Sequence, residues 1–231
     1  MAVAMGSWGL HVAALSLAPI SIVQSIIAGG LVLVTILADR WFGMNVSRRE
    51  WIGVGLTAAG LAFLAATIEH KTVDNAHATW DGVVLAGYVG GATLIGTVLL
   101  PIARRSRMEG IVLGVSAGAL WGASDITIKA LSGRTHDLGA GVLLHPLALV
   151  ILALSLYGVL VSGRSLQIAD AVPVIVVTSA TANVLTIASG PVVFGEPLPN
   201  APLALALRIA AFVLVVAATA LTPPPVRTAS A

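Results

Sequence analysis

The chain has 231 residues, of which 58% are hydrophobic and only 10% are charged, whereas a soluble domain carries about 25% charged residues. This composition excludes an ordinary soluble domain. The absence of cysteine from the sequence excludes disulfides, thiolate nucleophiles and cysteine-ligated metal centres. Twelve basic residues against ten acidic ones give a formal net charge of +2, and so small an excess does not indicate a nucleic-acid partner.

Apolar runs of about 20 residues, bounded by Pro, Gly or charge clusters, recur along the chain and predict membrane-spanning helices. We expect an all-α fold, a polytopic membrane helical bundle of about eight spans with the lipid bilayer as its first partner. The first run has no basic region like that of a signal peptide, because the first basic residue is Arg40, so we expect a true helix there. The predicted spans are residues 2–17, 20–38, 50–67, 82–102, 109–131, 141–162, 171–194 and 202–221.

The basic residues outside these spans are distributed unequally between the two sides of the membrane. Lys71 and Arg134 fall on one side. The other side holds eight: Arg40, Arg48, Arg49, Arg104, Arg105, Arg107, Arg164 and Arg227. Because Lys and Arg of short loops are retained in the cytoplasm, we expect a multi-pass protein of the cytoplasmic membrane with a cytoplasmic C-terminus.

Two short phrases recur in the second part of the chain and indicate an inverted internal repeat. Residues 14–18 (ALSLA) resemble residues 165–169 (SLQIA), and Phe42-Gly43 recurs as Phe194-Gly195. An odd number of crossings separates the copies, so the two units cross the membrane in opposite directions, as in many secondary transporters. The first repeat lacks helices that precede the second, so we expect an N-terminally short form. The predicted organisation is a partial first repeat of three spans at 1–67, a second repeat of five spans at 82–222 and a disordered cytoplasmic tail at 223–231.

The span at 109–131 carries two patterns with a spacing of four residues. Gly110, Gly114, Gly118 and Gly122 leave one helix face without side chains, which is typical of close helix packing. On the adjoining face Trp121, Asp125 and Lys129 are also four apart, so the carboxylate and the ammonium lie one turn apart and can pair. A charge inside a span is costly and is normally retained for ions, substrate or a partner. The sequence leaves open whether Asp125 is functional or only neutralises Lys129.

The span at 171–194 is polar for a membrane helix. Ser179, Asn183 and Thr186 share one face, and we expect Gly190-Pro191 to break the helix there, which would expose carbonyls that can coordinate a solute. The alternative is hydrogen bonding between helices. Gln24 of the span at 20–38 is a further pathway candidate. The single histidines His11 and His145 are interpreted as packing residues rather than proton carriers.

No pattern of an enzyme occurs in the sequence. The Gly-x-Ser-x-Gly, His-Glu-x-x-His and P-loop motifs are absent, and the scattered His, Asp and Glu residues show no spacing of metal ligands. We therefore expect no catalytic residues and no organic cofactor, and the sequence defines no metal site.

The ordered phrases of the chain resemble the drug/metabolite transporter superfamily, in particular its EamA-like bacterial members. The phrases are ALSLAPISIVQSI (14–26), RREWIGVGLTAAGLAFL (48–64), AGALWGASDITIKAL (117–131) and PVVFGEPLP (191–199). The resemblance implies nine or ten helices in two inverted repeats and transport of metabolites, drugs or, in one branch, divalent cations. The chain departs from this pattern in its short first repeat and in having Met44 where the second repeat has Glu196.

The sequence thus predicts a secondary transporter or exporter of a small solute, with candidate pathway residues Gln24, Trp121, Asp125, Lys129, Ser179, Asn183 and Thr186. The alternatives are a magnesium-type divalent cation permease and a non-transporting truncated paralogue or accessory membrane subunit. Expected partners are the bilayer and a small-molecule or ionic substrate, without nucleic acid, and a homodimer is left open.

Overall fold

The computed structural model describes residues 80–134, 139–169, 171–196, 198 and 201–221, together with scattered residues between 6 and 60. The residues from 80 onward that the structure describes are mostly helical, and none of them lies in a strand. Its elements are α5 (Gly82–Ala103), α6 (Glu109–Ser132), the short 3-10 helix η1 (Gly139–Leu144), α8 (Pro146–Ile168), α9 (Ala171–Val193) and α10 (Pro202–Leu221). The helices predicted at 82–102, 109–131, 171–194 and 202–221 are confirmed to within one residue at either end.

The prediction of a span at 141–162 is wrong in its bounds, because α8 begins at Pro146 and ends at Ile168. Proline is favoured in the first helical turn, where its missing N–H costs no hydrogen bond. His145 precedes it as the N-cap, and its Nδ1 accepts a hydrogen bond from the Leu147 amide at 3.2 Å. The residues before this cap form η1 instead of the first turns of the span.

The predicted break at Gly190-Pro191 is also wrong, since α9 continues through Pro191 to Val193. The helix ends where Gly195 adopts a left-handed conformation with φ of +61°, which is how many helices terminate. The Glu196 amide then donates to the Gly190 carbonyl at 3.0 Å, so the chain folds back over the last turn of α9.

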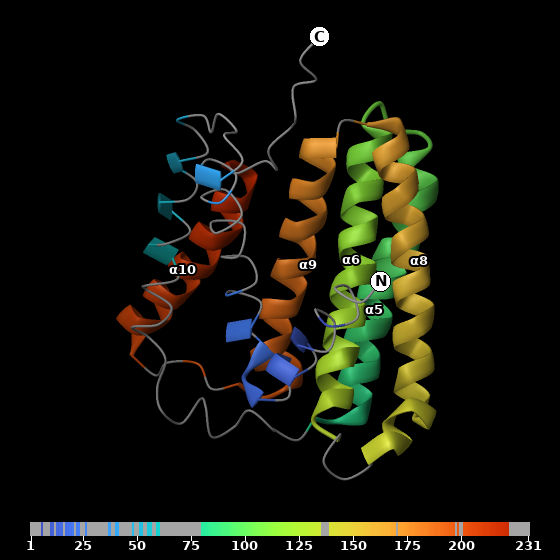
Figure 1. Ribbon diagram of the computed structural model, residues 1–231, viewed down its shortest axis with the longest axis vertical. Helices are drawn as coiled ribbons and strands as arrows, with labels where there is room; N and C mark the ends of the chain where they lie inside the picture. Colours follow the sequence, from blue (N-terminus) through green and yellow to red (C-terminus); the bar gives the residue numbers. More distant parts are fainter. Residues whose placement is uncertain are drawn as a thin grey trace.

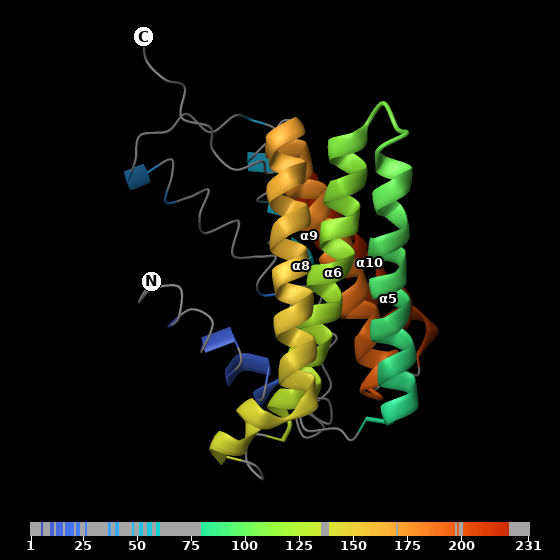
Figure 2. The ribbon, with the colours of Figure 1, turned by 90° about the vertical axis from the view of Figure 1, so that its right-hand side faces the viewer.

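Helix α6 is the centre of the described bundle (Figure 1), and it contacts α5, α8 and α9. Figure 2 shows α5, α6 and α8 side by side, with the turn between α5 and α6 at one end of the bundle. The glycine face of α6 contacts α9: a Cβ added at Gly114 would lie 2.8 Å from Val177, and one added at Gly122 would lie 3.2 Å from Leu185. The interpretation of this face as a packing surface is therefore confirmed.

Four of the described helices, α5, α6, α8 and the part of α9 from Pro173 onward, are long and apolar enough to cross a membrane. This length and composition agree with a membrane helical bundle. The predicted spans at 2–17, 20–38 and 50–67 are described only at scattered positions, and the tail at 223–231 lies outside the described residues. The total of about eight spans and the inverted repeat therefore stay predictions.

Candidate functional site

Several polar side chains of α6 bind neighbouring helices and hold the bundle together. The Ser116 hydroxyl donates to the Gly96 carbonyl of α5 at 2.6 Å, and Ser124 bonds Ser155 of α8 at 3.0 Å. In the other direction the Thr178 hydroxyl of α9 donates to the Gly114 carbonyl at 3.0 Å. Such interhelical hydrogen bonds strengthen helix packing where lipid offers no polar partner.

Trp121, a predicted pathway residue, belongs to this packing. Its indole N–H donates to the Ser162 hydroxyl of α8 at 3.0 Å, and its ring lies over Gly158, where an added Cβ would be 3.3 Å away. Glycine at 158 therefore makes room for the indole, and Trp121 joins α6 to α8.

Asp125 lies one turn further along α6 and contacts the beginning of the chain. Its Oδ1 is 3.6 Å from Nε2 of His11, and the two side chains are 24% and 21% exposed. They are thus only partly covered by protein. At this separation the carboxylate and the imidazole are close enough for an ion-pair contact but too far apart for a direct hydrogen bond. The structure therefore places His11, which sequence reasoning treated as a packing residue, beside the predicted functional aspartate.

Lys129 occupies a buried position and is only 6% exposed. Its ammonium donates to the backbone carbonyl of Leu15 at 2.5 Å and to that of Ala18 at 2.7 Å. In a continuous helix the Leu15 carbonyl would accept from the amide of residue 19, but that residue is proline and has no N–H. The ammonium of Lys129 thus supplies the donor that the Pro19 ring removes.

The Ala18 carbonyl is in a similar position. Its helical donor would be the Ile22 amide, which instead bonds the Pro19 carbonyl at 3.2 Å. Carbonyls at the end of a helical segment also attract positive charge through the helix dipole. One ammonium therefore satisfies two carbonyls at the break around Pro19 and joins this part of the chain to α6.

Glu196 completes a group of four ionisable side chains, after His11, Asp125 and Lys129. It is 6% exposed, and its carboxylate lies directly against Gly190, where a Cβ would overlap it. Its negative charge interacts favourably with the ammonium of Lys129. Sequence reasoning used Glu196 only as part of a family phrase, although a carboxylate next to the end of an apolar helix was a signal that could have identified it.

The polar face predicted on α9 points into the protein rather than away from it. Asn183 is 7% exposed and Thr186 is fully buried, while Ser179 is half-buried. The Thr186 hydroxyl donates to the Ala182 carbonyl at 2.9 Å within its own helix. A role of these residues in a solute pathway stays a prediction, and Gln24 lies outside the described residues.

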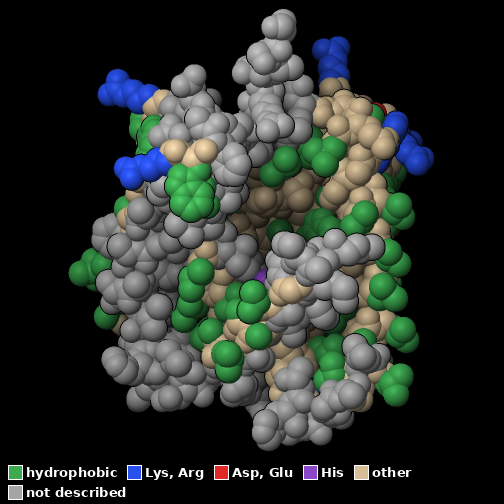
Figure 3. All heavy atoms as spheres, in the orientation of Figure 1, with side chains coloured by type: hydrophobic (Ala, Val, Ile, Leu, Met, Phe, Trp, Pro, Cys, Tyr) green, Lys and Arg blue, Asp and Glu red, His purple; other side chains and the backbone are tan. Residues whose placement is uncertain are grey.

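The face of the molecule in Figure 3 is hollowed near its middle, and a histidine side chain is visible beside the hollow. The Lys and Arg side chains visible on this face gather toward one end, the end at which α5 turns into α6. Among the described residues no group of three or more His, Asp or Glu side chains is arranged to hold a metal ion.

Comparisons of the chain with protein-family models, with curated proteins and with solved structures give no match. The class of protein therefore follows from the structure itself. The described part is all-helical, and four of its helices are long and apolar enough to span a bilayer, which agrees with a membrane helical bundle that carries ionisable side chains.

Proposed function

We propose that this protein is a secondary transporter or exporter that moves a small solute across the cytoplasmic membrane without an organic cofactor. The observation that carries the proposal is the group of four ionisable side chains in or next to apolar helices: His11, Asp125, Lys129 and Glu196. Charges inside a membrane bundle are costly, and they commonly mark substrate, ion or proton pathways.

Within this group Asp125 and His11 are the residues that we assign to the solute or the coupling ion. Their side chains are about one quarter and one fifth exposed, whereas Lys129 and Glu196 are nearly covered. A group that must load and release a solute has to be reached from a cavity, and a group that holds the fold together does not. We therefore assign Lys129 to the structure of the bundle and Asp125 to the transport cycle.

Replacing Asp125 with asparagine tests this assignment. The amide keeps the size of the side chain but cannot carry a negative charge, so we expect solute movement in reconstituted vesicles to stop while the helical fold is kept. The measurement is uptake or release of candidate solutes together with circular dichroism. Glu109→Gln, the same chemical change in the first turn of α6, should leave transport unchanged.

A purely structural role for Asp125 predicts a different result. Removal of Asp125 would then destabilise the protein because its contact with His11 is lost, and the double change Asp125→Leu with His11→Leu would restore both stability and transport. Transport by that double variant would contradict the assignment.

The alternative of a non-transporting scaffold or accessory subunit is favoured by one observation. The hydroxyls of Ser116, Ser124 and Thr178 and the indole of Trp121 are all hydrogen-bonded within or between helices, so much of the polar content of α6 and its neighbours serves packing. In that case vesicles containing the protein would move no solute, and Asp125→Asn would change only its stability.

The proposed orientation in the membrane gives a second prediction. The turn between α5 and α6 carries Arg104, Arg105 and Arg107. By the positive-inside rule, this turn belongs in the cytoplasm. The chain has no native cysteine, so single cysteines can be introduced without background. In intact cells a membrane-impermeant thiol reagent should leave Arg105→Cys unlabelled and label Gly141→Cys, which is exposed at the opposite end of α6. Labelling of Arg105→Cys would mean that the protein has the opposite orientation in the membrane.

A further inference from the structure

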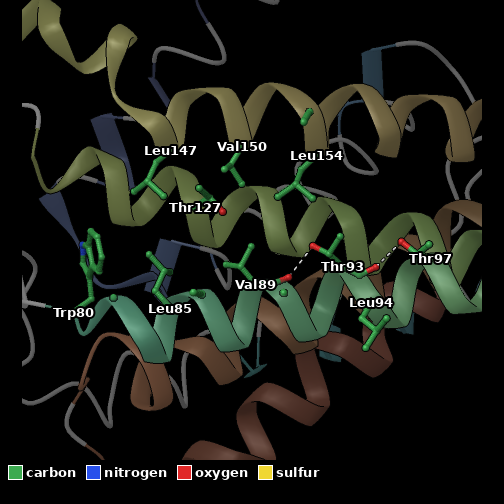
Figure 4. Close-up of a pocket in the computed structure, with 14 residues that line it drawn as sticks. Trp80, Leu85, Val89, Thr93, Leu94, Thr97, Thr127, Leu147, Val150 and Leu154 are labelled. Carbon is green, nitrogen blue, oxygen red and sulfur yellow. Dashed lines mark hydrogen bonds between the residues drawn. The ribbon is translucent and has the colours of Figure 1, made fainter.

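A second feature of the bundle lies apart from the ionisable group. Helices α5 and α8 pack on either side of α6 (Figure 2), and an open groove of about 690 Å³ lies between them. Figure 4 shows side chains of all three helices pointing into it. The groove is lined on α5 by Gly82, Leu85, Ala86, Val89, Gly90, Thr93, Leu94 and Thr97, and elsewhere by Trp80, Thr127, Leu147, Val150, Ala153 and Leu154.

The groove presents an apolar surface, although three threonines line it. The hydroxyl of Thr93 donates to the Val89 carbonyl at 2.7 Å, and that of Thr97 donates to the Thr93 carbonyl at 2.8 Å. The Thr127 hydroxyl likewise donates to its own helix at 2.8 Å. Because these donors are already used, what the groove offers an occupant is methyl and methylene contacts along its length.

The dimensions of the groove fit a single hydrocarbon chain. Its lining on α5 extends from Gly82 to Thr97, which at about 1.5 Å per residue is roughly 22 Å. One leaflet of the hydrocarbon core is about 15 Å thick. Gly82, Ala86 and Gly90 lie four residues apart and give the groove its depth, because they present little or no side chain.

The mouth of the groove has a different chemistry. Trp80 lies there, next to the first turn of α5, and its indole N–H donates to the Ala130 carbonyl at 3.1 Å. The guanidinium of Arg134 lies over the Trp80 ring, with its Cζ 4.7 Å from the ring centroid, and Arg134 is exposed. Tryptophan and arginine at the end of a membrane helix are typical of the headgroup region, where arginine binds phosphate.

We propose that this groove is a binding site for a membrane phospholipid. Its acyl chain lies between α5 and α8 on the floor formed by α6, and its phosphate lies at Arg134 over Trp80. An apolar channel with the cation of Arg134 at its mouth is complementary to a molecule with an anionic head and a hydrocarbon tail. This site is independent of the transport function proposed above.

The chain offers a matched pair of substitutions for the test. Gly90 lines the groove and Gly87 does not, and both lie in α5 with no atom within 4 Å of an added Cβ. Gly90→Leu therefore fills the groove, whereas Gly87→Leu adds the same side chain to the same helix outside it. Arg134→Gln removes the cation from the mouth.

The experiment uses the full chain in phosphatidylethanolamine vesicles containing a small fraction of phosphatidylglycerol with a photoactivatable acyl chain. After irradiation, labelled peptides are quantified by mass spectrometry. We expect labelling of the groove-lining segments of α5 and α8 in the wild type and in Gly87→Leu, and its loss in Gly90→Leu. In Arg134→Gln we expect about fivefold less labelling, the usual contribution of one cation near the membrane surface.

Two results would overturn the proposal. Equal labelling of all four proteins would mean that the groove is in contact with bulk lipid and does not bind a lipid specifically. An unlabelled groove, together with a dimer in native mass spectrometry that Gly90→Leu dissociates, would mean that a second copy of the chain covers it.

Discussion

Replacing Gly118 with alanine should destabilise the bundle by about 2 kcal/mol, in the usual range for overpacking a tightly packed contact. The added Cβ would overlap the Thr178 carbonyl oxygen of α9 and lie 2.7 Å from the Thr181 Cβ. Backbone atoms of a neighbouring helix cannot turn aside as a flexible side chain does, so α6 and α9 must separate. The expected loss of stability is measured by denaturant titration in micelles.

Gly87→Ala is the matched control for this prediction. An added Cβ at Gly87 of α5 meets no atom within 4 Å, so the same methyl group should leave stability unchanged or raise it, because alanine favours a helix more than glycine does. If the two variants are equally stable, α6 and α9 pack less closely in the membrane than the contacts at Gly118 indicate.

The second large effect is expected for Lys129→Met, which keeps the length of the side chain and removes its charge and its donors. The change would leave the Leu15 and Ala18 carbonyls without the ammonium that binds them and would remove the positive charge next to Glu196. Breaking a buried charge pair from one side costs about 3–5 kcal/mol. We therefore expect the protein to unfold at markedly lower denaturant concentration.

A double variant separates the two causes of this loss. Pro19→Ala restores an amide N–H at position 19 and so returns to the Leu15 carbonyl the donor that proline removes. If capping of this carbonyl matters, Pro19→Ala should recover part of the stability of Lys129→Met but gain little in the wild type, a coupling that a double-mutant cycle measures. Wild-type stability of Lys129→Met would contradict the role given to the ammonium.

The sequence alone was sufficient to predict helices of the described part where local signals are strong. Apolar length placed the helices at 82–102 and 109–131 almost correctly, because a stretch of about 20 apolar residues has no other stable structure in a bilayer. The four-residue glycine spacing in α6 correctly indicated close packing, since the absence of Cβ atoms is a property of the residues themselves. The helix at 141–162 was misplaced because the continuous apolar run concealed the cap at His145 and Pro146.

The ionisable group was only half predictable. Asp125 and Lys129 can be identified from the sequence as candidate functional residues, because charges in apolar helices are rare. Their contacts with His11, Leu15 and Ala18 join positions more than 100 residues apart. The pattern of residues within one segment cannot predict contacts between segments so far apart in the sequence.

The sequence by itself therefore determined the class of protein, the approximate bounds of most of the described helices and the helix face on which α6 packs, since hydrophobic length and side-chain volume act locally. The tertiary structure decided which groups meet: His11 with Asp125, and Lys129 with the carbonyls left by Pro19. It also opened the groove between α5 and α8. These features depend on how helices cross and on where turns such as that at Gly195 return the chain, and crossing geometry is set by the packing of all the neighbours together.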